Sequence, residues 1–339
     1  MLSRVAENIY WMSRYIERAE NTARLIDVNT FLLLDLPKQV APGWEPLIAI
    51  TGSGELYRSL YQGYSDKDVT RCLVSDRRNP GSILSSLQMA RENCRTIRDV
   101  VPRYAWEQIN QLYLWAEREV KGGLAKSARV AFLKGIIHQS QAITGLLAGT
   151  MNHDEGYDYL RIGRNLERAD MTTRIIDVRS QNLLTVDTGE LRPYDHIQWV
   201  AVLKSLTGYH MYRRSVQTRV RGPEVLGFLF QNPQFPRSVL HCINAVEQSL
   251  VNLPSSSRLR VSIERLRQRV LEPSVMSLGP AELSEFVDQV QIELAGLNDE
   301  LYDAYFSPLI QFTAAPELTL PRQGLREATP FAGQMMGQA

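Results

Sequence analysis

The chain has 339 residues, room for one large domain or two ordinary ones, and its 44% apolar and 22% charged content is typical of a packed soluble protein. Its 38 Lys and Arg residues are balanced by 37 Asp and Glu residues. Because the net charge is close to zero, no overall field attracts the protein to nucleic acid or to an anionic membrane. We therefore expect neither as a partner.

The first residues and the cysteines bear on cellular location. The start, MLSRVAENIYW, places charges where a signal peptide needs an unbroken apolar core. The sequence also has no apolar run of about 18 residues, the length needed to span a bilayer. We therefore expect a cytoplasmic protein. Cys72, Cys94 and Cys242 are isolated and odd in number, which favours buried small side chains over a disulfide framework or a zinc site.

Apolar residues recur at spacings of three and four throughout the chain, which predicts an all-α protein. The predicted helices are residues 2–34, 44–62, 66–75, 80–100, 103–122, 127–150, 156–183, 194–219, 222–231, 236–251, 256–272 and 279–305. Proline often precedes these segments and glycine often follows them, as helix starts and ends favour. Residues 307–339 have no sustained apolar period, so we expect a flexible C-terminal tail.

One charged phrase occurs twice in the chain. RYIERAENTARLIDV at residues 14–28 returns as RNLERADMTTRIIDV at residues 164–178 with nine identities in fifteen, where chance predicts about one. Further matches follow at a slightly larger offset: Trp44/Trp199, Val69/Val225, Leu73/Leu229, Pro80/Pro236, Ser82/Ser238 and Leu84/Leu240.

This pattern predicts an internal duplication, with one helical repeat at residues 1–150 and a second at residues 151–306. We expect the two repeats to pack as one helical bundle with pseudo-two-fold symmetry. The larger offset predicts a longer loop before Trp199 in the second repeat.

On a helix the repeated phrase has an apolar side and a charged side. The apolar side, which predicts the core, comprises Val5, Met12, Ile16, Ala19, Ala23 and Ile26. The charged side comprises Glu7, Arg14, Glu17, Arg18, Asn21 and Arg24. The second copy replaces Asn21 with Met171 and keeps the charged positions Arg164, Glu167, Arg168, Asp170 and Arg174.

A solvated helix face would be the simplest explanation of the charged side. Surface substitutions usually cost less than about 0.5 kcal/mol, so a solvated face rarely keeps the same charges in two diverged copies. We therefore expect partial burial, and two explanations remain. The Arg and Glu residues of the two copies pair with one another as a structural network, or the surplus of Arg leaves guanidinium groups to bind a carboxylate or phosphate.

These phrases, together with ARENCRTIRD at 90–99, EQINQLYLW at 107–115 and PRSVLHCI at 236–243, resemble the bacterial alpha-E family over roughly residues 1–305. The resemblance implies an all-helical domain encoded beside, or fused to, a circularly permuted ATP-grasp protein, often with a transglutaminase-like protease nearby. It implies peptide or amide-bond chemistry in which the partner, and not this chain, holds ATP and Mg.

Carrying the family's glutamate-bearing motif over to this sequence gives Glu17 and Glu167 as candidate catalytic residues. The candidate substrate-binding residues around them are Arg14, Arg18, Arg24, Arg164, Arg168 and Arg174.

Signals for other chemistry are weaker. There is no Glu-x-x-His pair and the five His residues are scattered, so we expect no metal site. TGSGE at residues 51–55 has glycines that could cradle a phosphate, but no Lys-Ser/Thr follows and no strand is predicted before it. No nucleophile motif is present. Asp154 is expected to cap the helix that begins near residue 156.

Three functional hypotheses follow. The first is an accessory or substrate-binding subunit that acts with an ATP-grasp amide or peptide ligase, presenting an acidic or peptide substrate through its arginine-bearing faces. The second is a purely structural scaffold or interaction protein. The third is an enzyme in its own right that uses Glu17 or Glu167 as general base. We take the first as the working hypothesis, in which the chain is not catalytic alone and binds no cofactor.

Overall fold

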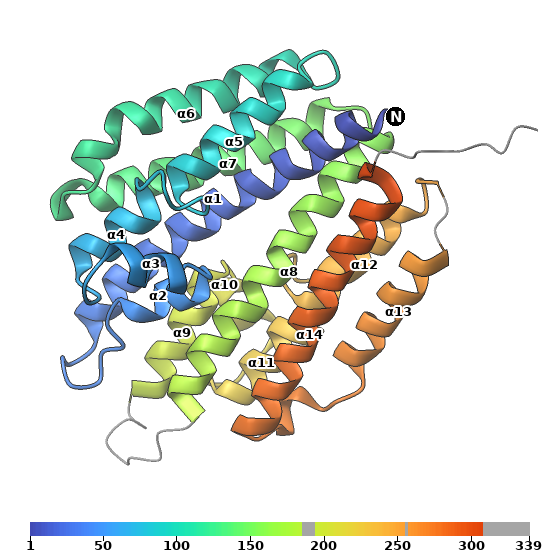
Figure 1. Ribbon diagram of the computed structural model, residues 1–339. Helices are drawn as coiled ribbons and strands as arrows, with labels where there is room; N and C mark the ends of the chain where they lie inside the picture. The colour runs from blue at the N-terminus through green and yellow to red at the C-terminus, as the bar shows by residue number, and fades with distance from the viewer. Residues whose placement is uncertain (185–193, 255–256, 308–339) are drawn as a thin grey trace, which may run out of the picture. The chain divides into compact units, whose positions relative to one another are not determined.

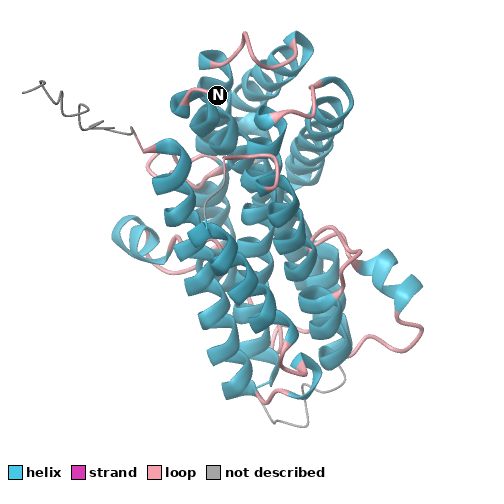
Figure 2. Cartoon of the chain, turned by 90° about the vertical axis from the view of Figure 1, so that its right-hand side faces the viewer, coloured by secondary structure: helices cyan, strands magenta, loops and turns pink. Residues whose placement is uncertain are grey.

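Every regular element in the described part of the chain, residues 1–184, 194–254 and 257–307, is helical in the computed structural model (Figure 2). The predicted all-α fold class is therefore confirmed. The predicted tail beyond Ser307 and most of the loop expected before Trp199 lie outside the described residues.

The helices of the first half differ in length in a set order, from one long helix through short ones to two long ones. They are α1 (Ser3–Asp35), α2 (Glu45–Ile50), α3 (Gly54–Leu60), α4 (Asp66–Val74), α5 (Ile83–Thr96), α6 (Arg103–Gly123) and α7 (Lys126–Thr150).

The second half runs through a similar succession. Its helices are α8 (Glu155–Leu184), α9 (Asp195–Ser205), α10 (Tyr209–Ser215), α11 (Gly222–Gln231), α12 (Val239–Leu250), α13 (Ser257–Leu271) and α14 (Pro280–Leu301), with a 3₁₀ turn η2 (Val275–Ser277) before α14 and a π-helical turn η3 (Tyr302–Phe306) after it. The duplication itself stays a prediction, which this succession supports.

The long helices α1 and α8 lie side by side in the middle of residues 1–307 (Figure 1). α1 packs against α5 and α7, and α8 packs in the same way against α12 and α14. The next helix of each half packs on the long helix of the other half, because α2 contacts α8 and α9 contacts α1. One apolar core therefore runs through both halves, and residues 1–307 form one compact unit.

Polar side chains begin several helices where the sequence indicates a start. Ser82 before α5 and Ser238 before α12 each accept a hydrogen bond from the backbone N–H three residues later, at 3.2 and 3.1 Å. Asp154 caps α8 as predicted, because its Oδ1 accepts from the backbone N–H of Gly156 at 3.0 Å. A cap of this kind contributes about 1 kcal/mol to helix stability.

Two predicted helices are interrupted, and their predicted extents were wrong. Residues 44–62 divide into α2 and α3 around Gly52, whose φ is 65°, and residues 194–219 divide into α9 and α10 around Thr207, whose φ is 57°. A left-handed residue ends a helix. Threonine is β-branched and rarely adopts a positive φ, so its residue type did not indicate the second break.

Candidate functional site

The charged sides of the two repeated phrases face each other across the contact between α1 and α8. Glu17 and Glu167 are only 2% and 1% exposed. The helices approach closely at Gly163, where a Cβ would collide with the backbone oxygen of Tyr10 and with Ser13 Oγ. The solvated-face interpretation is therefore excluded, because these carboxylates lie in the protein interior.

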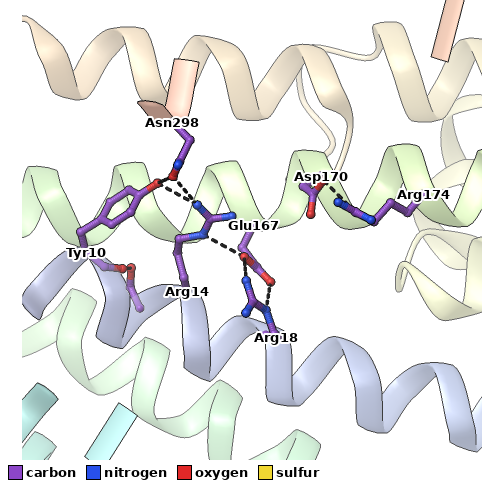
Figure 3. Close-up of polar contacts among 8 residues, drawn as sticks. Tyr10, Arg14, Arg18, Glu167, Asp170, Arg174 and Asn298 are labelled. Carbon is purple, nitrogen blue, oxygen red and sulfur yellow. Dashed lines mark hydrogen bonds and ion pairs between the residues drawn. The ribbon is translucent and has the colours of Figure 1, made fainter. Parts of the chain in front are cut away.

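Glu167 on α8 is held by two arginines of α1 (Figure 3). Arg18 binds it through two parallel hydrogen bonds, from Nε to Oε1 at 2.6 Å and from Nη2 to Oε2 at 2.9 Å. Arg14 Nε donates to Oε2 at 2.9 Å. The carboxylate thus accepts three charge-assisted hydrogen bonds, the strongest class in proteins.

Arg14 also connects this cluster to α14. Its Nη1 donates to Tyr10 Oη at 2.9 Å and to Asn298 Oδ1 at 2.6 Å, while Tyr10 donates to the same Asn298 oxygen at 2.6 Å. The guanidinium carbon lies 5.1 Å from the ring centroid of Trp11, a cation–π distance. Arg14 is therefore held by contacts to residues of α1, α8 and α14.

Glu17 on α1 is held by arginines of the second half. Arg168 Nε lies 3.1 Å from Glu17 Oε2, and Arg237, just before α12, pairs with Oε1. Arg237 is 5% exposed, and it also donates to Asn21 Oδ1 at 2.6 Å and to Glu20 Oε1 at 3.0 Å. The sequence did not identify Arg237 as a site residue, although it lies in the phrase PRSVLHCI.

The surroundings keep both central glutamates ionised. Burial by itself would raise the pKa of Glu17, but Arg168, Arg237 and Arg164 together lower it to about 2. Burial acts in the same direction on Glu167, and Arg18 and Arg14 lower its pKa to about 2. Each glutamate is thus a stable anion that is a poor acceptor of a substrate proton.

The remaining candidate arginines have less central places. Arg24 donates to Glu20 and Arg174 donates to Asp170 Oδ1 at 2.9 Å, each within its own helix at a spacing of four residues. Arg164, the counterpart of Arg14, lies near Glu17, but its Nε has no hydrogen-bond partner within the described residues. Burial lowers the pKa of Arg164.

The network carries an excess of positive charge. It contains four carboxylates, Glu17, Glu20, Glu167 and Asp170, and seven arginines, Arg14, Arg18, Arg24, Arg164, Arg168, Arg174 and Arg237. Arginines thus outnumber carboxylates by three within this set, although the whole chain has a formal net charge of only +1. The arrangement includes the predicted ionic network and leaves arginine for an anion.

A cavity of about 370 Å³ opens beside Glu167, and we call it the first cavity. Arg18, Asp170 and Arg174 form one wall. The TGSG loop forms another, and its Gly52 brings the backbone so close that Arg174 Nη1 lies 3.2 Å from the point where a Cβ would stand. The glycine-containing loop thus lies against Arg174 and lines the same cavity as Arg18.

A smaller cavity of about 280 Å³, the second cavity, opens beside Arg237. Its lining includes Glu20, Arg168, Thr207 and Pro236. The six candidate arginines are therefore divided: Arg14, Arg18 and Arg168 bind the central glutamates, Arg164 lies beside Glu17, and Arg24 and Arg174 flank the network.

Other chemistry finds little support in the described residues. They contain no group of three His, Cys, Asp or Glu side chains placed to hold a metal ion. Burial raises the pKa of the thiols of Cys72, Cys94 and Cys242 to about 11, 12 and 12, which makes them unreactive. No helix among these residues combines the length and apolar content that a bilayer crossing requires.

Comparison with known proteins gives a family and no activity. A family model described as a predicted alpha-helical domain with a conserved ER motif matches residues 1–306. The duplicated Glu-Arg dipeptides, Glu17–Arg18 and Glu167–Arg168, fit that description. No solved structure matches the chain.

Curated relatives include the uncharacterized proteins Mb2597 of Mycobacterium bovis and Rv2567 of Mycobacterium tuberculosis. Each is 23% identical over 344 residues, an alignment that covers 94% of this chain and 37% of the relative. The chain thus spans little more than a third of the length of these relatives.

Proposed function

This chain belongs to the Alpha-E family, and from that premise we propose that it is an accessory, substrate-binding subunit that acts with an ATP-grasp amide or peptide ligase. In this proposal the partner binds ATP and Mg and activates a carboxylate, while this chain presents an acidic or peptide substrate. Both proteins would then work in the cytoplasm, where ATP is available. The proposal of an ATP-grasp partner rests on the family resemblance.

One observation carries the binding role, namely the unused donor capacity of two arginines at the first cavity. A guanidinium has five N–H donors. Arg18 uses two of them for Glu167 and Arg174 uses one for Asp170 in the described structure. Since Arg binds carboxylate groups through paired donors, the remaining N–H groups suit an acidic ligand. A volume of about 370 Å³ lies within the range of small-molecule sites.

A structural scaffold is the second candidate, and a specific observation favours it. Arg14, Arg18 and Arg168 are committed to buried glutamates, and these contacts join the two halves. That part of the network holds the fold together whether or not a ligand binds. The two roles are compatible, because the scaffold fixes Arg18 while Arg174 faces the cavity.

Catalysis by Glu17 or Glu167 is the least supported of the three hypotheses. A general base works best when its pKa lies near the working pH, whereas both of these pKa values are about 2. Each side chain is also enclosed by arginines. We therefore assign them the role of orienting the arginines.

Calorimetric titration with glutarate, a small dicarboxylate, tests the binding role. We expect Arg174→Ala to weaken binding about tenfold or more, because a hydrogen bond to a charged group contributes roughly 1.5–3 kcal/mol. Arg103→Ala is the control, since Arg103 also pairs with a carboxylate four residues away, that of Glu107 on α6. Equal loss in both variants would contradict the binding role of Arg174. Measurable ATP binding by this chain alone would contradict the proposed division of labour between this chain and its partner.

A further inference from the structure

The two cavities are built from corresponding residues of the two halves. The first cavity is lined by Arg18, Gly52, Pro80, Gly81 and Asp170. The second cavity is lined by Arg168, Thr207, Pro236, Arg237 and Glu20, which are the matching positions in the same order. Gly52 and Thr207 even share the unusual positive φ. The cavities can therefore be compared position by position.

One position differs in a way that changes the chemistry. Arg237 in the second cavity places a guanidinium among Glu17, Glu20 and Asn21. Its counterpart in the first cavity is Gly81, which has no side chain. The cation that fills one cavity is thus missing from the other.

This difference leaves a carboxylate available in the first cavity. Glu20 accepts hydrogen bonds from Arg24, Arg237 and Gln141. Asp170, its counterpart, accepts a side-chain hydrogen bond only from Arg174 among the described residues, through Oδ1. Glu167 already accepts three hydrogen bonds from two arginines and Asp170 only one, so Asp170 is the carboxylate with more capacity to receive a ligand cation.

We propose that the first cavity binds a free α-amino acid, with its ammonium group beside Asp170 and Gly81 and its carboxylate on Arg174 and Arg18. The ammonium group then occupies the place that corresponds to the guanidinium of Arg237. This inference rests on the proposed binding role and names its ligand class.

The charges and the lining of the cavity fit this class. The two arginines and the two carboxylates of the wall, Glu167 and Asp170, sum to no net charge, which suits a zwitterion better than a simple anion. Leu56 and Met171 supply apolar surface for the rest of the ligand. Met171 stands where Asn21 helps to hold Arg237 in the other half.

A pair of probes that differ in the amino group tests the ligand class. L-Glutamate and glutarate carry the same two carboxylates, and only L-glutamate has the ammonium group. We expect calorimetry to show at least tenfold tighter binding of L-glutamate. Asp170→Asn, which removes the charge and keeps the shape, should reduce that preference to less than about threefold, because it removes the anionic partner of the ammonium group.

Filling the cavity gives a second test that does not depend on Asp170. In Gly81→Arg the new Cβ meets only Asn79 Oδ1 at 3.4 Å, an ordinary contact, so the variant should fold. Its guanidinium should occupy the ammonium position as Arg237 does in the other half and abolish L-glutamate binding. Gly122→Arg, on α6 where a Cβ meets nothing within 4 Å, adds the same charge elsewhere and should bind normally.

The outcomes separate this inference from the proposed function. Equal affinity for the two probes, lost in Arg174→Ala, would overturn the amino-acid class and leave the carboxylate-binding role standing. Undiminished L-glutamate binding by Gly81→Arg would overturn the location. Binding of neither probe at millimolar concentration would overturn both.

Discussion

At the scale of single residues, Glu167 compensates the buried Arg14 and the partly buried Arg18 at once. Replacing a buried ion pair by apolar residues is often neutral, but removing one partner leaves an uncompensated charge in the interior. Arg14 would be left in that state, and the partly buried Arg18 would also lose its partner. The glutamate therefore matters more for stability than an ordinary ion pair does.

We predict that Glu167→Ala lowers the free energy of unfolding by roughly 3–5 kcal/mol, measured by urea denaturation. Glu107→Ala is the control, because Glu107 pairs with Arg103 on the exposed surface of α6 and should cost less than about 1 kcal/mol. Similar losses in the two variants would show that the buried network contributes no more to the free energy of unfolding than a surface ion pair does.

The pKa of about 2 at both central glutamates predicts a dependence of stability on pH. Their ordinary value is 4.5, so folding lowers the pKa and favours the ionised form. This contribution is fully present above about pH 4.5 and is lost as the pH falls towards 2. Denaturation midpoints measured across that range should fall with pH, and Glu167→Gln should show a shallower fall. An equally steep fall in the variant would assign the effect to other groups.

The sequence offered a network between the two copies as one of two explanations, because the same residues occur at the same helix positions in both. Arg14, Arg18 and Arg168 do pair with the glutamate of the other copy, whereas Arg24 and Arg174 pair within their own helices. The sequence could not predict Arg237, whose partner Glu17 lies 220 residues earlier and whose own counterpart is Gly81. It also could not show that Arg164 and Arg14 make different contacts. Arg237 pairs with Glu17 in one half only, and Arg164 is left at the edge of the network.

At the scale of elements, the network requires α1 and α8 to lie unusually close. Gly163 makes this possible, since any side chain there would collide with the backbone of Tyr10. A backbone atom cannot move aside as the end of a flexible side chain can. The helices would have to separate, which would stretch the contacts of Arg14 and Arg18 to Glu167.

Gly163→Ala should therefore destabilise the protein by about 1–3 kcal/mol, the usual cost of overpacking, in spite of alanine's higher helix propensity. Gly145→Ala on α7 is the matched control, because a Cβ there meets nothing within 4 Å. That variant should be neutral or up to about 1 kcal/mol more stable. Thermal unfolding followed by circular dichroism measures both, and a neutral Gly163→Ala would mean that the helices are not closely packed there.

The elements themselves were predictable where an apolar period of three and four continues over many residues. α1, α6, α7 and α8 begin and end within a few residues of their predicted positions. The breaks at Gly52 and Thr207 were missed, because each is a single left-handed residue within a continuing apolar pattern. Such a residue is selected by tertiary packing, which a local pattern does not record.

At the scale of the whole molecule, the two halves exchange contacts instead of folding apart. Each long helix packs on the other, and α2 and α9 each pack on the long helix of the opposite half. The matching helix order, the paired Ser82 and Ser238 caps and the corresponding cavities all support the predicted duplication. The extent of this exchange was not visible in the sequence, because no local signal tells which half a helix will cover.

This exchange predicts that neither half is stable alone. Residues 1–152 would expose the face of α1 that packs on α8, and would leave Glu17 without Arg168 and Arg237. We expect this fragment to lack a cooperative thermal transition in circular dichroism. Mixing it with residues 153–307 should restore the transition and give a one-to-one complex in size-exclusion chromatography. Cooperative unfolding of residues 1–152 alone would instead mean that the halves are independent domains, and that the arginine–glutamate network joins finished units instead of completing a single fold.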